Sequence, residues 1–133
     1  MPATGQAQGA RPGLSTLARR ADFLAAARAR RQSRPGLVLQ ARHRAADETP
    51  GAIRVGYTCS KKVGNAVARN RAKRRLRAAA RAVLPTHGRP GWDYVLIGRP
   101  QATAACPFSG LCDDLAEAIA AIHAPRKPER EGL

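Results

Sequence analysis

Apolar and polar residues follow three patterns typical of strands. Residues 53–59 alternate between apolar and polar positions, with a period of two, which predicts a half-buried strand. The apolar set, expected to face the core, is Val55, Tyr57 and Cys59. Shorter continuous apolar runs predict two more strands, over residues 37–42 and 92–98.

A period of 3.6 residues begins after the strand at residues 53–59. It predicts a long helix that starts at Asn65, a suitable N-cap, and ends at about Leu84, before Pro85. Its apolar stripe is narrow and mostly alanine: Ala68, Ala72, Leu76, Ala79 and Val83. Basic residues occupy the opposite side, so the helix is expected to dock one face and expose a cationic face.

Two further helices are predicted, over residues 21–31 and residues 108–122, the latter capped by Ser109. Turn residues separate the elements, at Ser33–Gly36 and over residues 47–51. Together these elements predict one α/β domain, an α+β two-layer sandwich in the order αβββαβα. We expect three helices and a small, mainly antiparallel sheet of about four strands.

Composition bounds the domain and its location. The chain has 133 residues, of which 44% are hydrophobic and 4% aromatic, enough for one modest core. We expect residues 1–17 to be a disordered arm, residues 18–124 the folded domain and residues 125–133 a disordered tail. No apolar run suits a signal peptide or a membrane span, and three cysteines do not make a disulfide framework. A cytoplasmic location is therefore expected.

Charge is unevenly distributed along the chain. The formal net charge is +15, and no Asp or Glu occurs between Thr49 and Trp92. Seven basic residues lie between Arg69 and Arg81 alone. Because solvated surfaces usually mix both signs of charge, this segment predicts a polyanionic partner, most simply a nucleic acid.

Catalytic patterns are missing from the sequence. The cysteines lack zinc-ligand spacing, the histidines are isolated, and no glycine-rich phosphate loop is present. The acidic residues Asp113, Asp114 and Glu117 have the spacing of a helix surface. We therefore expect no catalytic residue in this protein.

One segment carries a specific resemblance. Residues 60–77 read SKKVGNAVARNRAKRRLR, and they closely resemble the signature of the bacterial ribonuclease P protein component, S-K-K-x-G-N-A-V-x-R-N-R-x-K-R-x-x-R. Asp22-Phe23, the strands at 37–40 and 54–60 and the strand at 93–97 also resemble that family in order. The resemblance covers about residues 18–123.

The resemblance implies a fold and a function. In that family the signature helix joins two parallel central strands by a left-handed crossover, an exception to the right-handed rule. The family protein is the small subunit of a ribonucleoprotein that removes the 5′ leader of precursor tRNA. Its RNA subunit is the catalyst and uses Mg²⁺. The implied partners are one ribonuclease P RNA and the precursor tRNA, with no protein partner and no membrane.

The resemblance also implies RNA-binding residues: Lys61, Lys62, Arg69, Asn70, Arg71, Lys73, Arg74, Arg77 and Arg81. Within this set, Arg69 and Lys73 are expected toward the leader, and Arg74 and Arg77 toward the RNA subunit. Asn70 resembles a position close to a bound metal ion, although one amide is a weak ligand. No other metal ligand is expected in the protein.

The leader cleft of the family lies between the first helix and the open face of the sheet. The matching residues here are Phe23, Val38, Gln40 and Thr58. This chain departs from the family at Ala27 and at Gln40, where aromatic residues are frequent, so weaker or differently tuned stacking on the leader is expected. Phe23 has an alternative interpretation, as a core anchor of the first helix.

Three alternatives to this function are considered. A ribosomal or other structural RNA-binding protein would share the small size and the arginine excess, and only the signature separates the two. A DNA-binding protein with the long helix in the major groove is less favoured, because that helix has few Asn or Gln residues suited to base edges. A nuclease acting without RNA lacks catalytic groups.

Overall fold

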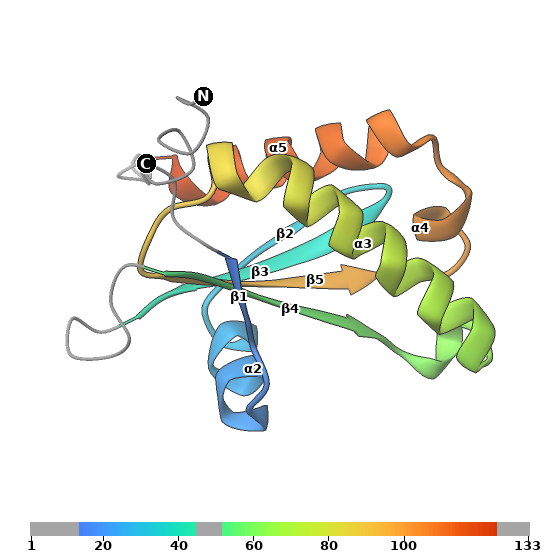
Figure 1. Cartoon of the computed structure of the whole chain (residues 1–133), viewed down its shortest axis with the longest axis horizontal. Coiled ribbons are helices and arrows are strands. Elements are labelled where there is room, and N and C mark those ends of the chain that lie inside the picture. Colours follow the sequence, from blue (N-terminus) through green and yellow to red (C-terminus); the bar gives the residue numbers. More distant parts are fainter. Residues whose placement is uncertain (1–13, 45–51, 125–133) are drawn as a thin grey trace, which may run out of the picture.

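The computed structural model describes residues 14–44 and 52–124. A five-stranded sheet forms its centre, with helices on both faces (Figure 1). In chain order the elements are β1 (Leu14–Thr16), α2 (Arg20–Ala27), β2 (Arg30–Ser33), β3 (Leu37–His43), β4 (Ile53–Cys59), η1 (Lys61–Val63), α3 (Ala66–His87), β5 (Trp92–Gly98), α4 (Ala102–Ala105) and α5 (Phe108–His123). The mixed α/β class is as predicted.

The strand order is β1-β4-β5-β3-β2. β4 pairs in parallel with both β1 and β5, whereas β3 pairs antiparallel with both β5 and β2. The described sheet has five strands where about four were predicted, and α4 adds a fourth helix to the three predicted. The sheet is mixed and not mainly antiparallel, because two of its four strand pairs are parallel. α3 links the parallel neighbours β4 and β5, as the resemblance implied; the hand of this crossover stays a prediction.

The main core lies between the sheet and the pair α3 and α5, which run along the same face (Figure 1). Alternate residues of the central strands, such as Leu39, Val55 and Leu96, pack there against Leu76 and Leu115. Each is at least 97% buried. The predicted stripe of α3 is confirmed except at its first turn, where Ala68 is only partly buried.

α2 covers part of the opposite face of the sheet. A smaller cluster of Leu17, Ala26 and Val95 lies beneath it, with Phe23 and Ile97 against it. The strand residues between the core positions, expected to face outward, therefore meet α2 over part of their length. Gly56 is one of them and is buried under Phe23.

The N-terminal boundaries differ from the prediction. The first helix ends at Ala27 rather than at residue 31, because Arg30–Ser33 instead form the edge strand β2, which pairs with β3 across the predicted turn. The folded domain also begins before residue 18, since Leu14–Thr16 pair with β4 and Leu17 is 4% exposed. Three predicted segments lie outside the described residues: the rest of the expected arm, the loop at 47–51 and the tail at 125–133.

Two helix ends also differ. α3 continues through Pro85 to His87, and the Gly88 N–H closes it on the Leu84 carbonyl at 2.8 Å. Leu84 is fully buried, so packing of this last turn outweighs the local cost of the proline. Ser109 does not cap α5; the helix begins after Pro107, with no side-chain cap.

No helix among the described residues is long and apolar enough to cross a bilayer. Cys59, Cys106 and Cys112 are free thiols, each partly buried. Cys59 packs against the core from β4, as its place in the apolar set predicted, and Cys106 and Cys112 lie beside α4 and on α5.

Candidate RNA interface

α3 starts from a tight, capped turn. The Asn65 Oδ1 accepts a hydrogen bond from the Ala68 N–H at 3.0 Å, so the predicted N-cap is present. Gly64 has φ 140°, and a Cβ there would lie 2.8 Å from the Cβ of Ala68, so glycine is required. The Arg69 guanidinium donates to the Gly64 carbonyl at 2.8 Å. This arginine therefore helps to fix the turn from which the cationic helix leaves the sheet.

The cationic side of α3 is exposed and uncompensated. Most of the residues expected to bind RNA are exposed: Lys61, Lys62, Asn70, Arg71, Arg74, Arg77 and Arg81. Arg69 and Lys73 are partly buried near Cys59, at the end of β4. Within residues 14–44 and 52–124, none of the cationic members pairs with a carboxylate. Their charge is therefore free to act on an external anion.

Tyr57 links this helix to the sheet. The Arg77 guanidinium lies 5.1 Å from the centre of the Tyr57 ring, a cation–π distance. Burial raises the pKa of Tyr57, and the positive charges of Arg77 and Arg81 partly oppose that rise. The same ring borders a cleft of about 270 Å³ between β1 and α3. The alternation of β4 indicated only a core role for Tyr57, so its second role was missed.

The nearby thiol of Cys59 is not activated. Burial raises its pKa, and the hydrogen bond from Gly98 together with Lys73 and Arg69 only partly offsets that effect. A thiol with a raised pKa is a poor nucleophile at neutral pH. The site therefore has cationic chemistry but no activated nucleophile.

Arg75 belongs to the same basic run but has a structural role. Its guanidinium donates to the Cys106 carbonyl, at the end of α4. It therefore ties α3 to the segment before α5 and does not belong to the exposed set. It is not among the residues that the resemblance implies for RNA binding.

The expected leader-cleft residues all lie on the α2 face of the sheet. Val38, Ile97 and Thr58 form one cross-strand row, because Val38 and Thr58 both pair with Ile97. Phe23 and Thr58 line a cleft of about 370 Å³ together with Ala18, Arg20 and Tyr57. Val38 and Gln40 are only 7% and 8% exposed, so they support this face from below and do not line the cleft.

Phe23 packs α2 against the sheet and also lines the cleft. Its ring packs so closely on the sheet that a Cβ at Gly56 would lie 2.5 Å from its Cζ. It also contacts the small cluster of Leu17, Ala26 and Val95, yet it keeps part of its surface in the cleft. The two interpretations of Phe23 are therefore compatible. Arg20 and Tyr57 are additional cleft residues; helix position and strand alternation alone did not indicate them.

On the α2 face of the sheet, the buried carboxylate of Asp93 holds several arginine side chains. Asp93 is fully buried and accepts from Arg44 at 2.7 Å and from Arg54, in a two-point contact, at 2.8 Å for each bond. Arg42 lies 3.6 Å away, and Arg54 also reaches Asp22 of α2 at 3.5 Å. The network joins three strands to α2, so it is structural. An acid inside an otherwise apolar strand was its only sign in the sequence.

Among the described residues, no ligand cluster accompanies Asn70. No group of three or more His, Cys, Asp or Glu side chains gathers among the described residues. Asn70 itself stands on the exposed side of α3 among arginine and lysine residues, which repel a divalent cation. The residues present therefore do not fit a protein-held Mg²⁺.

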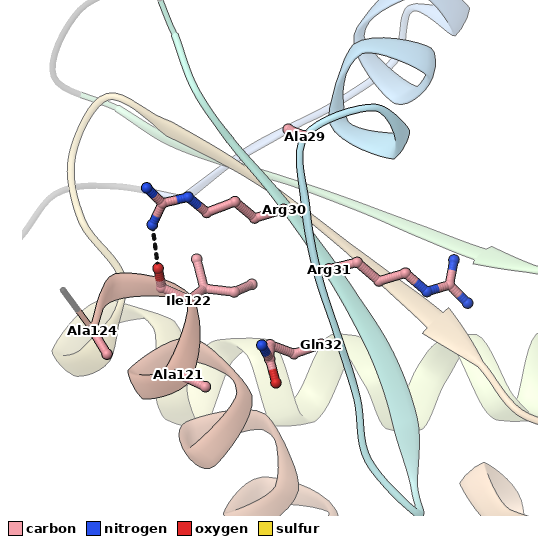
Figure 2. Close-up of a pocket in the computed structure, with 7 residues that line it drawn as sticks. All are labelled: Ala29, Arg30, Arg31, Gln32, Ala121, Ile122 and Ala124. Carbon is pink, nitrogen blue, oxygen red and sulfur yellow. Dashed lines mark hydrogen bonds between the residues drawn. The ribbon is translucent and has the colours of Figure 1, made fainter. Parts of the chain in front are cut away.

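The edge strand β2 borders another cleft, of about 340 Å³, against the end of α5 (Figure 2). Arg30 donates to the Ile122 carbonyl there and lies 5.8 Å from the centre of the Trp92 ring, while Arg31 points to the other side of the strand. Arg30 is therefore engaged within the protein. The hydrogen bond of Arg30 joins β2 to the end of α5. None of the residues expected to bind RNA lines this cleft.

Known proteins resemble this chain in both sequence and fold. The family model described as Ribonuclease P matches residues 12–123 of this chain. The ribonuclease P protein component of Ruegeria pomeroyi is 68% identical over 114 residues, covering 86% of this chain and 90% of that protein. The chain belongs to the ribonuclease P protein family. A second ribonuclease P protein component, from Paramagnetospirillum magneticum, is 48% identical over 116 residues and 86% of each chain.

Solved structures of ribonuclease P proteins share the fold. The protein of Thermotoga maritima aligns with a TM-score of 0.65 at 22% identity, over 83% of this chain and 99% of that one. The Staphylococcus aureus protein aligns with a TM-score of 0.64 at 23% identity, over 81% of this chain and 94% of that one. The resemblance seen in the signature segment is thus confirmed for the family and the fold. A ribosomal-type protein is correspondingly disfavoured.

Proposed function

We propose that this chain is the protein subunit of ribonuclease P. In this role it binds one ribonuclease P RNA and the 5′ leader of precursor tRNA, and assists removal of the leader to give the mature 5′ end. The observation that carries the proposal, beside family membership, is the exposed cationic side of α3 next to a cleft walled by Phe23 and Tyr57. These cations pair with no carboxylate of residues 14–44 and 52–124. Phosphates bind the cationic side, and unpaired bases stack in the cleft.

The chemistry of cleavage is assigned to the RNA. Phosphodiester hydrolysis at neutral pH needs a metal-activated water or an equivalent general base. The described residues offer neither a ligand cluster nor an activated nucleophile, and the exposed charge on α3 is positive. Mg²⁺ therefore belongs with the RNA phosphates, and the protein contributes by neutralising phosphates and holding the leader. These two roles require no protein partner. A cytoplasmic location is compatible with them.

The basic residues of α3 and the proposed leader cleft are close together. Lys73 and Arg69 approach the end of β4, where Thr58 and Tyr57 border the leader cleft. Arg74 and Arg77 lie farther along the exposed side of α3. The leader can therefore pass from the cleft to Arg69 and Lys73, while the separate RNA subunit binds Arg74 and Arg77.

Reconstitution tests this proposal. The protein, the ribonuclease P RNA of Ruegeria pomeroyi and a precursor tRNA are mixed at low Mg²⁺, and leader removal is measured with and without protein. We expect strong stimulation, and its loss in Arg74→Ala/Arg77→Ala. In RNA binding, this double variant should reduce the slope of log K against log salt by about 1.4–1.8, if each contact accounts for about 0.7–0.9.

Arg28→Ala/Arg89→Ala is the matched control. It removes the same charge from exposed residues that follow α2 and α3 and are not among those expected to bind RNA, and should keep most of the stimulation. Intact RNA binding without any stimulation of cleavage would contradict the proposal and return the structural RNA-binding alternative. Equal affinity for precursor and mature tRNA would contradict the leader cleft alone.

A further inference from the structure

A separate cavity lies between the first turns of α3 and the short helix α4. Its volume is about 440 Å³, within the range of about 300–1,000 Å³ typical of small-ligand sites. Val63, Val67, Ala68 and Ala104 form an apolar wall, and Arg71 and Gln101 bring polar side chains to it. None of these residues borders the leader cleft.

The apolar wall stands on an otherwise cationic helix. Val67 is 74% exposed, the most exposed large apolar side chain among the described residues. Its position on α3 is one turn before Arg71 and two turns before Arg74, both exposed. Burying Val67 against a flat apolar surface would be favourable, and any partner must at the same time tolerate the arginines.

The polar residue Gln101, which lines the cavity, has an unusual backbone conformation. Gln101 has φ 64°, and it is the one described residue other than glycine with a positive φ. The α4 turn is anchored by buried Thr103, whose Oγ1 accepts from the Arg99 N–H at 2.7 Å and donates to the Gly36 carbonyl at 2.6 Å. Such strained residues persist where the surroundings hold them, frequently at ligand sites. The exposed Gln101 amide offers a donor and an acceptor.

We propose that this cavity receives one unstacked nucleobase of the RNA that binds α3. The base lies on Val67 and Ala104, its edge meets the Gln101 amide, and Arg71 binds the phosphate of the same nucleotide. The inference rests on the proposed function, because it needs an RNA on α3. It adds a base-reading contact to an interface otherwise made of phosphate contacts.

Charge selects RNA over a protein as the occupant. Arg71 lines the cavity, and Lys61 and Lys62 precede its wall residue Val63 in η1. None of the three pairs with a carboxylate within the described part of the chain. A polyanion with exposed planar faces satisfies both the cations and the apolar wall. Recognition of RNA bases in loops and bulges commonly combines such stacking with hydrogen bonds to base edges.

Two variants change the cavity without changing charge. Val67→Ser removes the apolar wall, and Ala104→Leu adds a side chain at the cavity. Ala82→Leu is the matched control, because it adds the same bulk at an exposed position three helical turns beyond Asn70. Urea unfolding establishes that each variant is folded before RNA is added.

Binding to the Ruegeria pomeroyi ribonuclease P RNA is then measured over a range of salt, with chemical probing of base edges. We expect Val67→Ser and Ala104→Leu to bind about five- to tenfold more weakly, with an unchanged salt slope, because no phosphate contact is lost. At least one unpaired base, protected by wild-type protein and by Ala82→Leu, should become reactive with both variants.

Affinities within twofold of wild type and an unchanged footprint would overturn the base pocket, and would leave a protein as its occupant. A reduced salt slope in Val67→Ser would also overturn it, since the defect would then lie in phosphate contacts. Failure of the wild-type protein to bind this RNA or to stimulate cleavage would instead contradict the proposed function. The two failures are therefore distinguishable.

Discussion

Asp93 is the residue whose surroundings most constrain the domain. Its carboxylate is fully buried and is held by Arg44, Arg54 and Arg42, so three strands converge on one negative charge. A buried ion pair is weak evidence for stability by itself, because desolvation offsets attraction. Removal of one member is different, since the remaining charges stay buried.

Asp93→Asn should therefore destabilise the protein by about 3–5 kcal/mol. The expected readout is a lower midpoint in urea unfolding. Asp113→Asn is the control: Asp113 is exposed on α5, and its change should stay within about 0.5 kcal/mol. A similar small effect for both variants would show that the arginine residues find other partners.

His123 makes stability depend on pH. Burial, with Arg89 and Arg30, lowers its pKa from 6.5 to about 4, and its Nε2 lies 2.7 Å from the Tyr94 hydroxyl. The neutral ring shares a hydrogen bond with the Tyr94 hydroxyl, whose oxygen accepts from the Arg89 N–H at 2.9 Å. Since the unfolded chain takes up this proton near pH 6.5 and the folded one only near pH 4, stability should fall as pH decreases between these values.

His123→Gln keeps a hydrogen-bonding group beside Tyr94, since an amide can donate or accept, and it cannot titrate. Its urea midpoint should therefore change less than that of wild type between pH 7 and pH 5. His87→Gln, at an exposed position of α3, serves as the control. A wild-type and a His123→Gln protein with identical pH profiles would count against the assignment.

At the scale of elements, the sequence predicted those whose own patterns are strong. β4 and β5 have the predicted bounds, because their apolar residues are buried in the core. β2 was missed: Arg30–Ser33 has no apolar alternation, and only pairing with β3 makes it a strand. β1 was missed for the same reason, since three residues acquire their structure from β4, far along the chain.

Helix caps give a direct test at this scale. Asn65→Ala should cost about 1 kcal/mol, because the Ala68 N–H loses its acceptor. Ser109→Ala should cost much less, since Ser109 makes no cap for α5. Urea unfolding of both variants checks this expectation; equal losses would contradict the assignment of caps.

At the scale of the whole molecule, the cationic site was more predictable than the clefts. Residue spacing on α3 alone placed Arg74, Arg77 and Arg81 on the solvent side. The clefts depend on which side chains α2, α4 and β1 bring to the surface, and spacing along the chain does not encode those contacts. Arg20, Tyr57 and Gln101 were missed for this reason.

The N-terminal strand can be tested by truncation. Deletion of residues 1–17 removes β1 and the buried side chain of Leu17, and should lower the free energy of unfolding by about 2 kcal/mol or more. Deletion of residues 1–13 leaves both in place and should cost clearly less. Equal stability of the two truncated proteins would show that β1 contributes little.

The connection of β4 to β5 through α3 has a consequence for hydrogen exchange. The helix that carries the cationic face is tied at both ends to the two central strands, and its inner face, with Leu76 and Ala80, is fully buried. Amides in its middle turns should therefore exchange only when the whole domain unfolds, together with those of β5. Local opening cannot then reshape this face, so adjustments during assembly would fall to the RNA.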